Sequence, residues 1–107
     1  MKLPAPVQTY FDADRDDDAD RLMNAFAIDA RVEDEGATHI GQADIAVWWR
    51  AAKDRYQPVT TPVDAETIGS LTIVKASVSG SFPGSPALLT FKLGVAGNRI
   101  AHLEIGA

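Results

Sequence analysis

The sequence has 107 residues and no cysteine; 46% of the residues are hydrophobic, 23% are charged, and the formal net charge is -5. Such a chain suffices for one soluble globular domain, which we expect to span residues 1–107. The acidic balance argues against binding to nucleic-acid phosphates or anionic membranes, and the lack of cysteine excludes disulfides and thiolate chemistry. Because the first residues form no long apolar run, we expect no signal peptide, no membrane span and a cytoplasmic location.

Residues 7–34 predict two short helices followed by a strand. Apolar residues repeat at the i, i+3, i+4 spacing of a helix face in two places, Val7, Tyr10, Phe11 and Leu22, Met23, Phe26. Between these faces, Asp16, Asp17 and Asp18 can accept hydrogen bonds at the start of the second helix, whose positive end favours acidic residues. A strand-like pattern follows at residues 30–34.

The acidic run at residues 12–20 holds six aspartates in nine positions. Its start imitates a calcium loop, but Asp17 occupies the position of the required glycine and Met23 that of the bidentate glutamate. We therefore interpret the run as a solvated turn between helices. The two histidines are far apart in the chain and no phosphate-binding loop is present, so the sequence predicts neither a metal nor a cofactor.

The remainder of the chain predicts a short hairpin at residues 35–41, one long helix and then successive strands. The helix is expected at residues 42–56, where it ends before Pro58, and its apolar stripe consists of Ile45, Trp48, Trp49 and Ala52. Its charged residues, Lys53 among them, are expected in solvent. Strands are expected at residues 59–68, 71–79, 87–95 and 99–105. Pro62 indicates an edge position or a bulge in the first of these strands, and the order of elements is that of an α+β fold.

Several residues in this arrangement resemble the nuclear transport factor 2-like superfamily, and most of all its SnoaL-like and ketosteroid isomerase branch. Tyr10 stands where the isomerases carry a helix tyrosine, and Asp34 ends a Val-Glu-Asp run that carries their catalytic base. Residues 41–48 and 82–86 are similar to SnoaL-like segments, so the resemblance covers nearly the whole chain. It implies an α+β cone in which a curved, mostly antiparallel sheet wraps the N-terminal helices around a ligand pocket. It also implies a homodimer that binds a hydrophobic small molecule.

The resemblance further implies that Asp34 is a proton-shuttling base and that Tyr10 donates a hydrogen bond to a developing oxyanion. An apolar wall raises the pKa of a carboxylate, and a neighbouring phenol stabilises an enolate. The second oxyanion acid of the isomerases corresponds to Leu89, which cannot donate a hydrogen bond, so His102 is a third catalytic candidate in its place. The implied substrate-binding residues are Phe26, Trp48, Leu89, Phe91 and Glu104.

Two functions from different classes fit these residues. The first is an enzyme that transfers a proton beside a carbonyl, by isomerisation or by a polyketide cyclase-like enolisation. The second is a non-catalytic module of the same fold that binds a ligand or supports dimerisation. Each residue also has a structural alternative, since Tyr10 fits a core position, Asp34 a turn cap, and His102 an ordinary place in a sheet.

Overall fold

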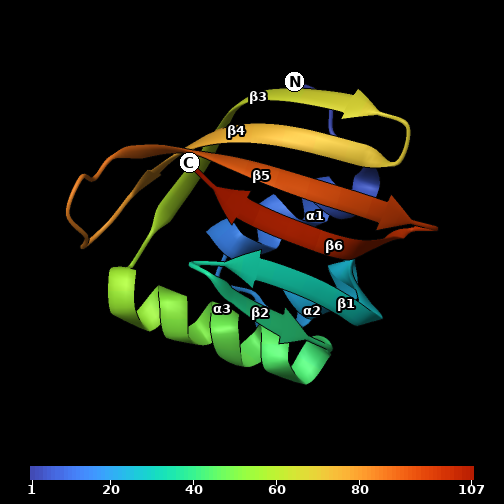
Figure 1. The fold of residues 1–107 in the computed structure, drawn as a ribbon, viewed down its shortest axis with the longest axis horizontal. Helices are drawn as coiled ribbons and strands as arrows, with labels where there is room; N and C mark the ends of the chain where they lie inside the picture. The colour runs from blue at the N-terminus through green and yellow to red at the C-terminus, as the bar shows by residue number, and fades with distance from the viewer.

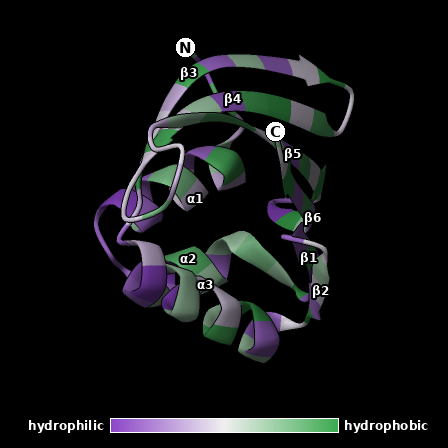
Figure 2. Ribbon diagram, turned by 60° about the vertical axis from the view of Figure 1, so that its left-hand side comes forward, coloured by the Kyte–Doolittle hydropathy of each residue, from purple (hydrophilic) through white to green (hydrophobic).

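The fold is that of a computed structural model, which describes residues 1–107. Its elements are α1 (Ala5–Arg15), α2 (Ala19–Ala25), β1 (Phe26–Asp34), β2 (Ala37–Ile40), α3 (Gln42–Tyr56), β3 (Val59–Ile68), β4 (Leu71–Ser79), β5 (Ala87–Ala96) and β6 (Arg99–Gly106). The sheet curves around α1 and α2, while α3 lies beside β1 and β2 (Figure 1; Figure 2). The predicted α+β class, with helices packed in a curved sheet, is confirmed.

The six strands form one sheet in the order β2-β1-β6-β5-β4-β3. All neighbouring strands are antiparallel except β1 and β6, which are parallel. β3 is an edge strand, and its register against β4 shifts between Pro62 and Asp64. Both interpretations of Pro62 are therefore confirmed, because a residue without an N–H is tolerated at an edge or at a bulge.

The acidic turn between α1 and α2 caps the second helix as expected. The Asp18 side chain accepts a hydrogen bond from the Arg21 backbone N–H at 3.2 Å. The prediction for Phe26 is wrong, because this residue is extended (φ −96°, ψ 146°) and opens β1 instead of continuing α2. Its side chain is fully buried in the core, so its apolar character reflects a strand position that faces the helices.

α3 begins and ends where the sequence predicts. It starts after Gly41 and stops at Gln57, which adopts the left-handed conformation, with Pro58 directly behind it. Ile45 and Trp49 are its buried residues. At 15 residues it is the longest helix, and no helix has the length and apolar character needed to cross a membrane.

Side chains of β5 and β6 alternate between the two faces of the sheet. On β5, Phe91 and Leu93 are buried against the helices, whereas Leu88 and Lys92 are exposed on the outer face. β6 pairs with β5 so that Leu103 lies opposite Leu93 and is buried with it. This pairing decides which β6 residues face the interior, with consequences for the site.

Candidate functional site

A cavity of about 660 Å³ lies between the helices and the concave face of the sheet. α1 and α3 supply most of its polar wall, while β4, β5, β6 and the loop before β5 supply an apolar wall. Its lining includes Tyr10, Asp14, Asp34, Glu35, Trp48, Trp49, Lys53, Tyr56, Phe82, Leu89 and Phe91. The size and the mixed lining fit a small organic molecule with a few polar groups.

Asp34 ends β1 and is half-buried in this cavity. Its Oδ2 accepts a hydrogen bond from Trp48 Nε1 at 3.0 Å. Burial away from water raises the pKa of Asp34 above its ordinary value, and this effect outweighs the hydrogen bond from Trp48, which lowers it. Asp34 is therefore a stronger base, once ionised, than a carboxylate in water.

Tyr10 is almost fully buried on the inner face of α1. Its ring packs edge-to-face against Phe11 and Phe26, with centroid distances of 5.0 and 5.9 Å. Burial holds the pKa of Tyr10 well above its ordinary value, and the carboxylates of Asp14 and Asp34 raise it further. The phenol thus stays protonated, and the hydrogen bonds of the cavity wall do not involve its hydroxyl, which is free to donate to a ligand.

A second polar cluster joins α1 to α3, and it was not predicted from the sequence. Asp14 Oδ1 accepts from Trp49 Nε1 at 2.8 Å and lies 3.2 Å from Lys53 Nζ. The same ammonium donates to the Asp14 backbone oxygen at 2.7 Å. The side chains of Asp14 and Lys53 are only 10% and 15% exposed, so the prediction that Lys53 lies in solvent is wrong.

Helical spacing offered a signal for this cluster. Asp14 lies four residues after Tyr10, and Lys53 lies four residues after Trp49, so each charged residue shares a helix face with a buried aromatic one. The interpretation of residues 12–20 as a solvated turn is wrong for Asp14, whose side chain is buried. A buried charge needs a partner of opposite charge, and here Asp14 on α1 and Lys53 on α3 are partners of each other.

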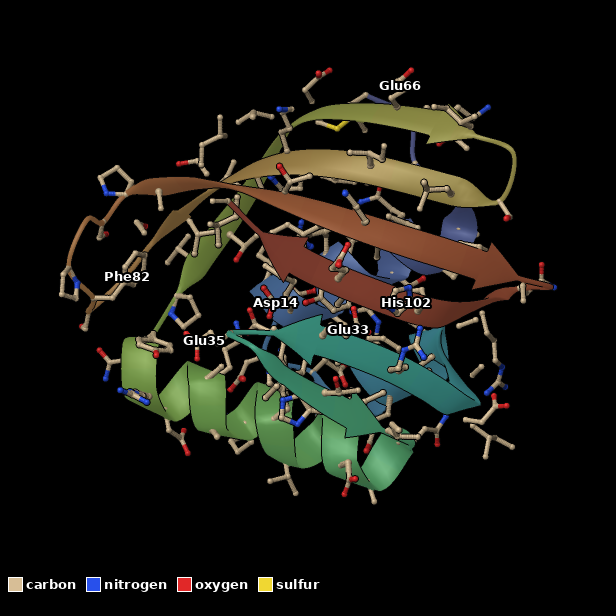
Figure 3. The ribbon with its side chains drawn as sticks, in the orientation of Figure 1. Asp14, Glu33, Glu35, Glu66, Phe82 and His102 are labelled. Carbon is tan, nitrogen blue, oxygen red and sulfur yellow. The ribbon has the colours of Figure 1, made fainter.

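The end of α3 and the loop before β5 frame one end of the cavity. Tyr56 Oη donates to Glu35 Oε1 at 2.9 Å, and its ring packs edge-to-face on Phe82 at 6.0 Å. In Figure 3, Glu35 and Phe82 lie at this end of the molecule, near the C-terminal turn of α3. The hydrogen bond to Glu35 raises the pKa of Tyr56.

The remaining predicted site residues divide into two groups. Trp48, Leu89 and Phe91 line the cavity together with Tyr10 and Asp34. Phe26 does not, since its side chain is enclosed in the core.

His102 and Glu104 lie on the outer face of the sheet, which corrects the prediction that they face the pocket. His102 Nε2 is 3.5 Å from Glu33 Oε2, and the two residues are neighbours across β1 and β6 in Figure 3. Glu104 Oε1 is 3.9 Å from Lys92 Nζ. The two residues do share a face, as expected, but the pairing of β6 with β5 turns Leu103 inward and both of them outward.

This placement leaves Leu89 without the compensation that His102 was expected to give. Leu89 lines the cavity with an aliphatic side chain, whereas His102 lies on the other face of the sheet and opposite Gly94, further along β5. The β5 residues that line the cavity, Ala87, Leu89 and Phe91, therefore offer it no side-chain hydrogen-bond donor.

Solved structures resemble this chain over nearly its whole length. A candidate polyketide cyclase from Sinorhizobium meliloti is 48% identical, with a TM-score of 0.96, and the alignment covers 97% of this chain and 95% of the other. A protein from Catenulispora acidiphila with a ketosteroid isomerase-like fold, in complex with trimethylamine, is 21% identical, with a TM-score of 0.85 and coverage of 99% and 87%. A candidate ketosteroid isomerase from Kribbella flavida is 15% identical, with a TM-score of 0.84 and coverage of 95% and 74%.

At their low identities the last two structures indicate a shared fold. No protein-family model matches the chain. No curated protein matches it significantly.

Proposed function

This chain belongs to the nuclear transport factor 2-like superfamily, in its SnoaL-like and ketosteroid isomerase-like branch, and on that premise we propose that it is an enzyme that transfers a proton beside a carbonyl. The substrate is an apolar small molecule that carries this carbonyl group. The observation that carries the proposal is the shared cavity of Asp34 and Tyr10, a half-buried carboxylate of raised pKa and a phenol held protonated by burial. The 48% identity to a candidate polyketide cyclase supports an enolisation or cyclisation.

In this mechanism Asp34 removes a proton from the carbon next to the carbonyl. The electrons of the broken C–H bond form the carbon–carbon double bond of the enolate, and the carbonyl oxygen becomes an oxyanion. Tyr10, which is itself almost fully buried, donates a hydrogen bond to that oxyanion. Asp34 then returns the proton to another carbon. In a cyclisation the enolate carbon instead bonds to a second carbonyl carbon of the substrate, the π bond of that carbonyl breaks, and the resulting alkoxide takes the proton back from Asp34.

The direct test follows the removal of the proton itself, independently of the final product. A β,γ-unsaturated ketosteroid is incubated with the protein in deuterium oxide, and the loss of its α-proton signal is followed by NMR, beside an absorbance assay for the conjugated enone. Exchange without conjugation supports enolisation without steroid isomerisation. Saturable binding without exchange contradicts the proposal and favours the non-catalytic ligand-binding module.

Leu89 offers a gain-of-function prediction. We expect Leu89→Asp to raise the exchange rate by about tenfold or more, because an acid in an apolar wall stays protonated and adds a donor to the oxyanion. Leu88→Asp is the matched control, since Leu88 is the neighbouring residue on β5 and is 59% exposed on the outer face. Equal rates in both variants would mean that the oxyanion does not form near Leu89.

The superfamily resemblance also leads us to propose a homodimer that pairs through the outer face of the sheet. That face is mixed in character, with exposed Leu88 and Leu71 beside Lys75 and Lys92. Thr72, in contrast, is fully buried on the inner face. We expect light scattering at micromolar concentration to give twice the mass of the chain, and a monomer there would contradict the dimer.

A further inference from the structure

The second polar cluster lies in the same cavity as Asp34 and Tyr10. Tyr10 and Asp14 are one turn apart on α1, Trp49 and Lys53 are one turn apart on α3, and all four line the cavity. The two helix faces meet at Asp14, so the Lys53 ammonium is held against the helix that carries Tyr10.

The Lys53 ammonium keeps hydrogen-bond donors for a ligand. An ammonium carries three N–H donors. One of them donates to the Asp14 backbone oxygen at 2.7 Å, and the Asp14 carboxylate pairs with the same ammonium at 3.2 Å from Oδ1. The positive charge is mostly removed from water, where its attraction to a negative oxygen is stronger than at the surface.

The surroundings of Lys53 fix the position of this charge. Trp49 donates to the same Asp14 oxygen, so the acceptor is itself held in place. Nζ also lies 5.6 Å from the centroid of the Trp49 ring, which favours a cation over its face. A donor that is already oriented costs little reorganisation when negative charge develops next to it.

We propose that Lys53, held by Asp14 and Trp49, is the second donor of an anion-binding site whose first donor is the Tyr10 hydroxyl. The ligand class is a small molecule with an anionic oxygen on an apolar frame, an enolate or a phenolate. The identification of that oxygen as a reaction intermediate rests on the proposed function. Lys53 then supplies from α3 the donor that Leu89 cannot supply from β5.

A phenol that changes colour on ionisation tests this site without any turnover. para-Nitrophenol is bound to the Asp34→Asn variant, whose uncharged side chain imitates the base after it has taken up the proton, and the bound phenolate fraction is followed by absorbance against pH. We expect Lys53→Met, made in this background, to lower the ionisation constant of the bound phenol by about tenfold or more. Tyr10→Phe is expected to lower it as well.

Arg50 supplies the matched control. It lies one turn before Lys53 on α3, pairs with Asp17 at 3.3 Å, and borders an outer polar groove but not the cavity. Arg50→Met removes one positive charge from the same helix, and we expect it to leave the ionisation of the bound phenol nearly unchanged. An equal effect of Arg50→Met and Lys53→Met would mean that Lys53 acts only as a distant charge and does not donate to the bound phenolate, which overturns the assignment.

Lys53→Met leaves Asp14 without its ion pair, so a second variant guards against a folding defect. Asp14→Asn combined with Lys53→Met removes both charges. Because the Asp14 carboxylate then no longer opposes a nearby anion, we expect a loss of phenol ionisation that is smaller than in Lys53→Met alone but still clear, from a folded protein. Unchanged ionisation in either variant, or no binding of the phenol, overturns the proposal. Proton exchange on the ketosteroid is measured separately, so a Lys53-dependent phenolate without exchange would refute the proposed catalysis and leave the anion site standing.

Discussion

Asp34→Asn is expected to lower the rate of α-proton exchange by about 10²–10⁴-fold, because it removes the general base while keeping the size of the side chain. Its amide can still accept the hydrogen bond from Trp48 that holds residue 34 in place. The measurement is the NMR exchange assay on the wild type and the variant, with ligand affinity determined in parallel. Lost exchange with retained affinity would separate a role in chemistry from a role in binding.

Glu33→Gln is the control for this experiment. Glu33 precedes Asp34 on β1 but points to the outer face, where it lies near His102. The substitution removes a carboxylate from the same strand without touching the cavity, so exchange should continue at the wild-type rate. If Glu33→Gln were as slow as Asp34→Asn, the effect would come from the net charge of the protein.

The raised pKa of Asp34 also predicts how the free energy of unfolding depends on pH. In the folded state Asp34 holds its proton more tightly than in the unfolded state, so its favourable contribution is complete below the unfolded pKa. That contribution is lost as the pH rises through the raised folded pKa. Asp34→Asn should therefore stabilise the fold at neutral pH but not in acid, as measured by urea unfolding at the two pH values. In the wild type the exchange rate should rise over the same pH range, as Asp34 loses its proton.

Phe26→Ala is expected to lower the free energy of unfolding by about 3–5 kcal/mol, because it leaves a cavity where a fully buried ring had packed. The ring contacts Tyr10 edge-to-face at 5.9 Å, so the loss also loosens the support of the phenol. In a chain of this size, each kcal/mol shifts the melting temperature by about 4–8 °C. Thermal and urea unfolding measure the effect.

Leu89→Ala is the counterpart to this substitution, since Leu89 is half-buried and lines the open cavity. It should cost less stability than Phe26→Ala and should change ligand affinity more. A Phe26→Ala protein that stays stable but no longer binds ligand would mean that Phe26 lines the pocket. That result would contradict its position in the core.

The sequence by itself predicted the secondary structure well where a local rule decides it. α3, β3 and β4 have the predicted ends, because proline, glycine and a helical or alternating apolar pattern act within a few residues. Phe26 was misplaced, since the spacing Leu22, Met23, Phe26 suits a helix face while the backbone at Phe26 is already extended. The end of α2 was the least specified boundary, because no glycine or proline marks it.

The sequence also placed Tyr10, Trp48, Leu89 and Phe91 in positions that the structure brings to the cavity, and Asp34 with them. These residues lie on helix faces or strand positions whose direction follows from local periodicity. Periodicity does not show which of these inward-facing residues line the same pocket. That expectation came from the superfamily resemblance.

Only the tertiary structure decided the face of β6 and the partners of the buried charges. His102 and Glu104 point outward because β6 pairs with β5 and β1 in one register, and a shift of one residue would turn both inward. Asp14 and Lys53 are 39 residues apart in the chain, so nothing near either residue shows that the other neutralises it. Secondary structure follows from short-range backbone preferences, whereas strand register and the pairing of charges depend on contacts between distant segments, which form only when the chain folds.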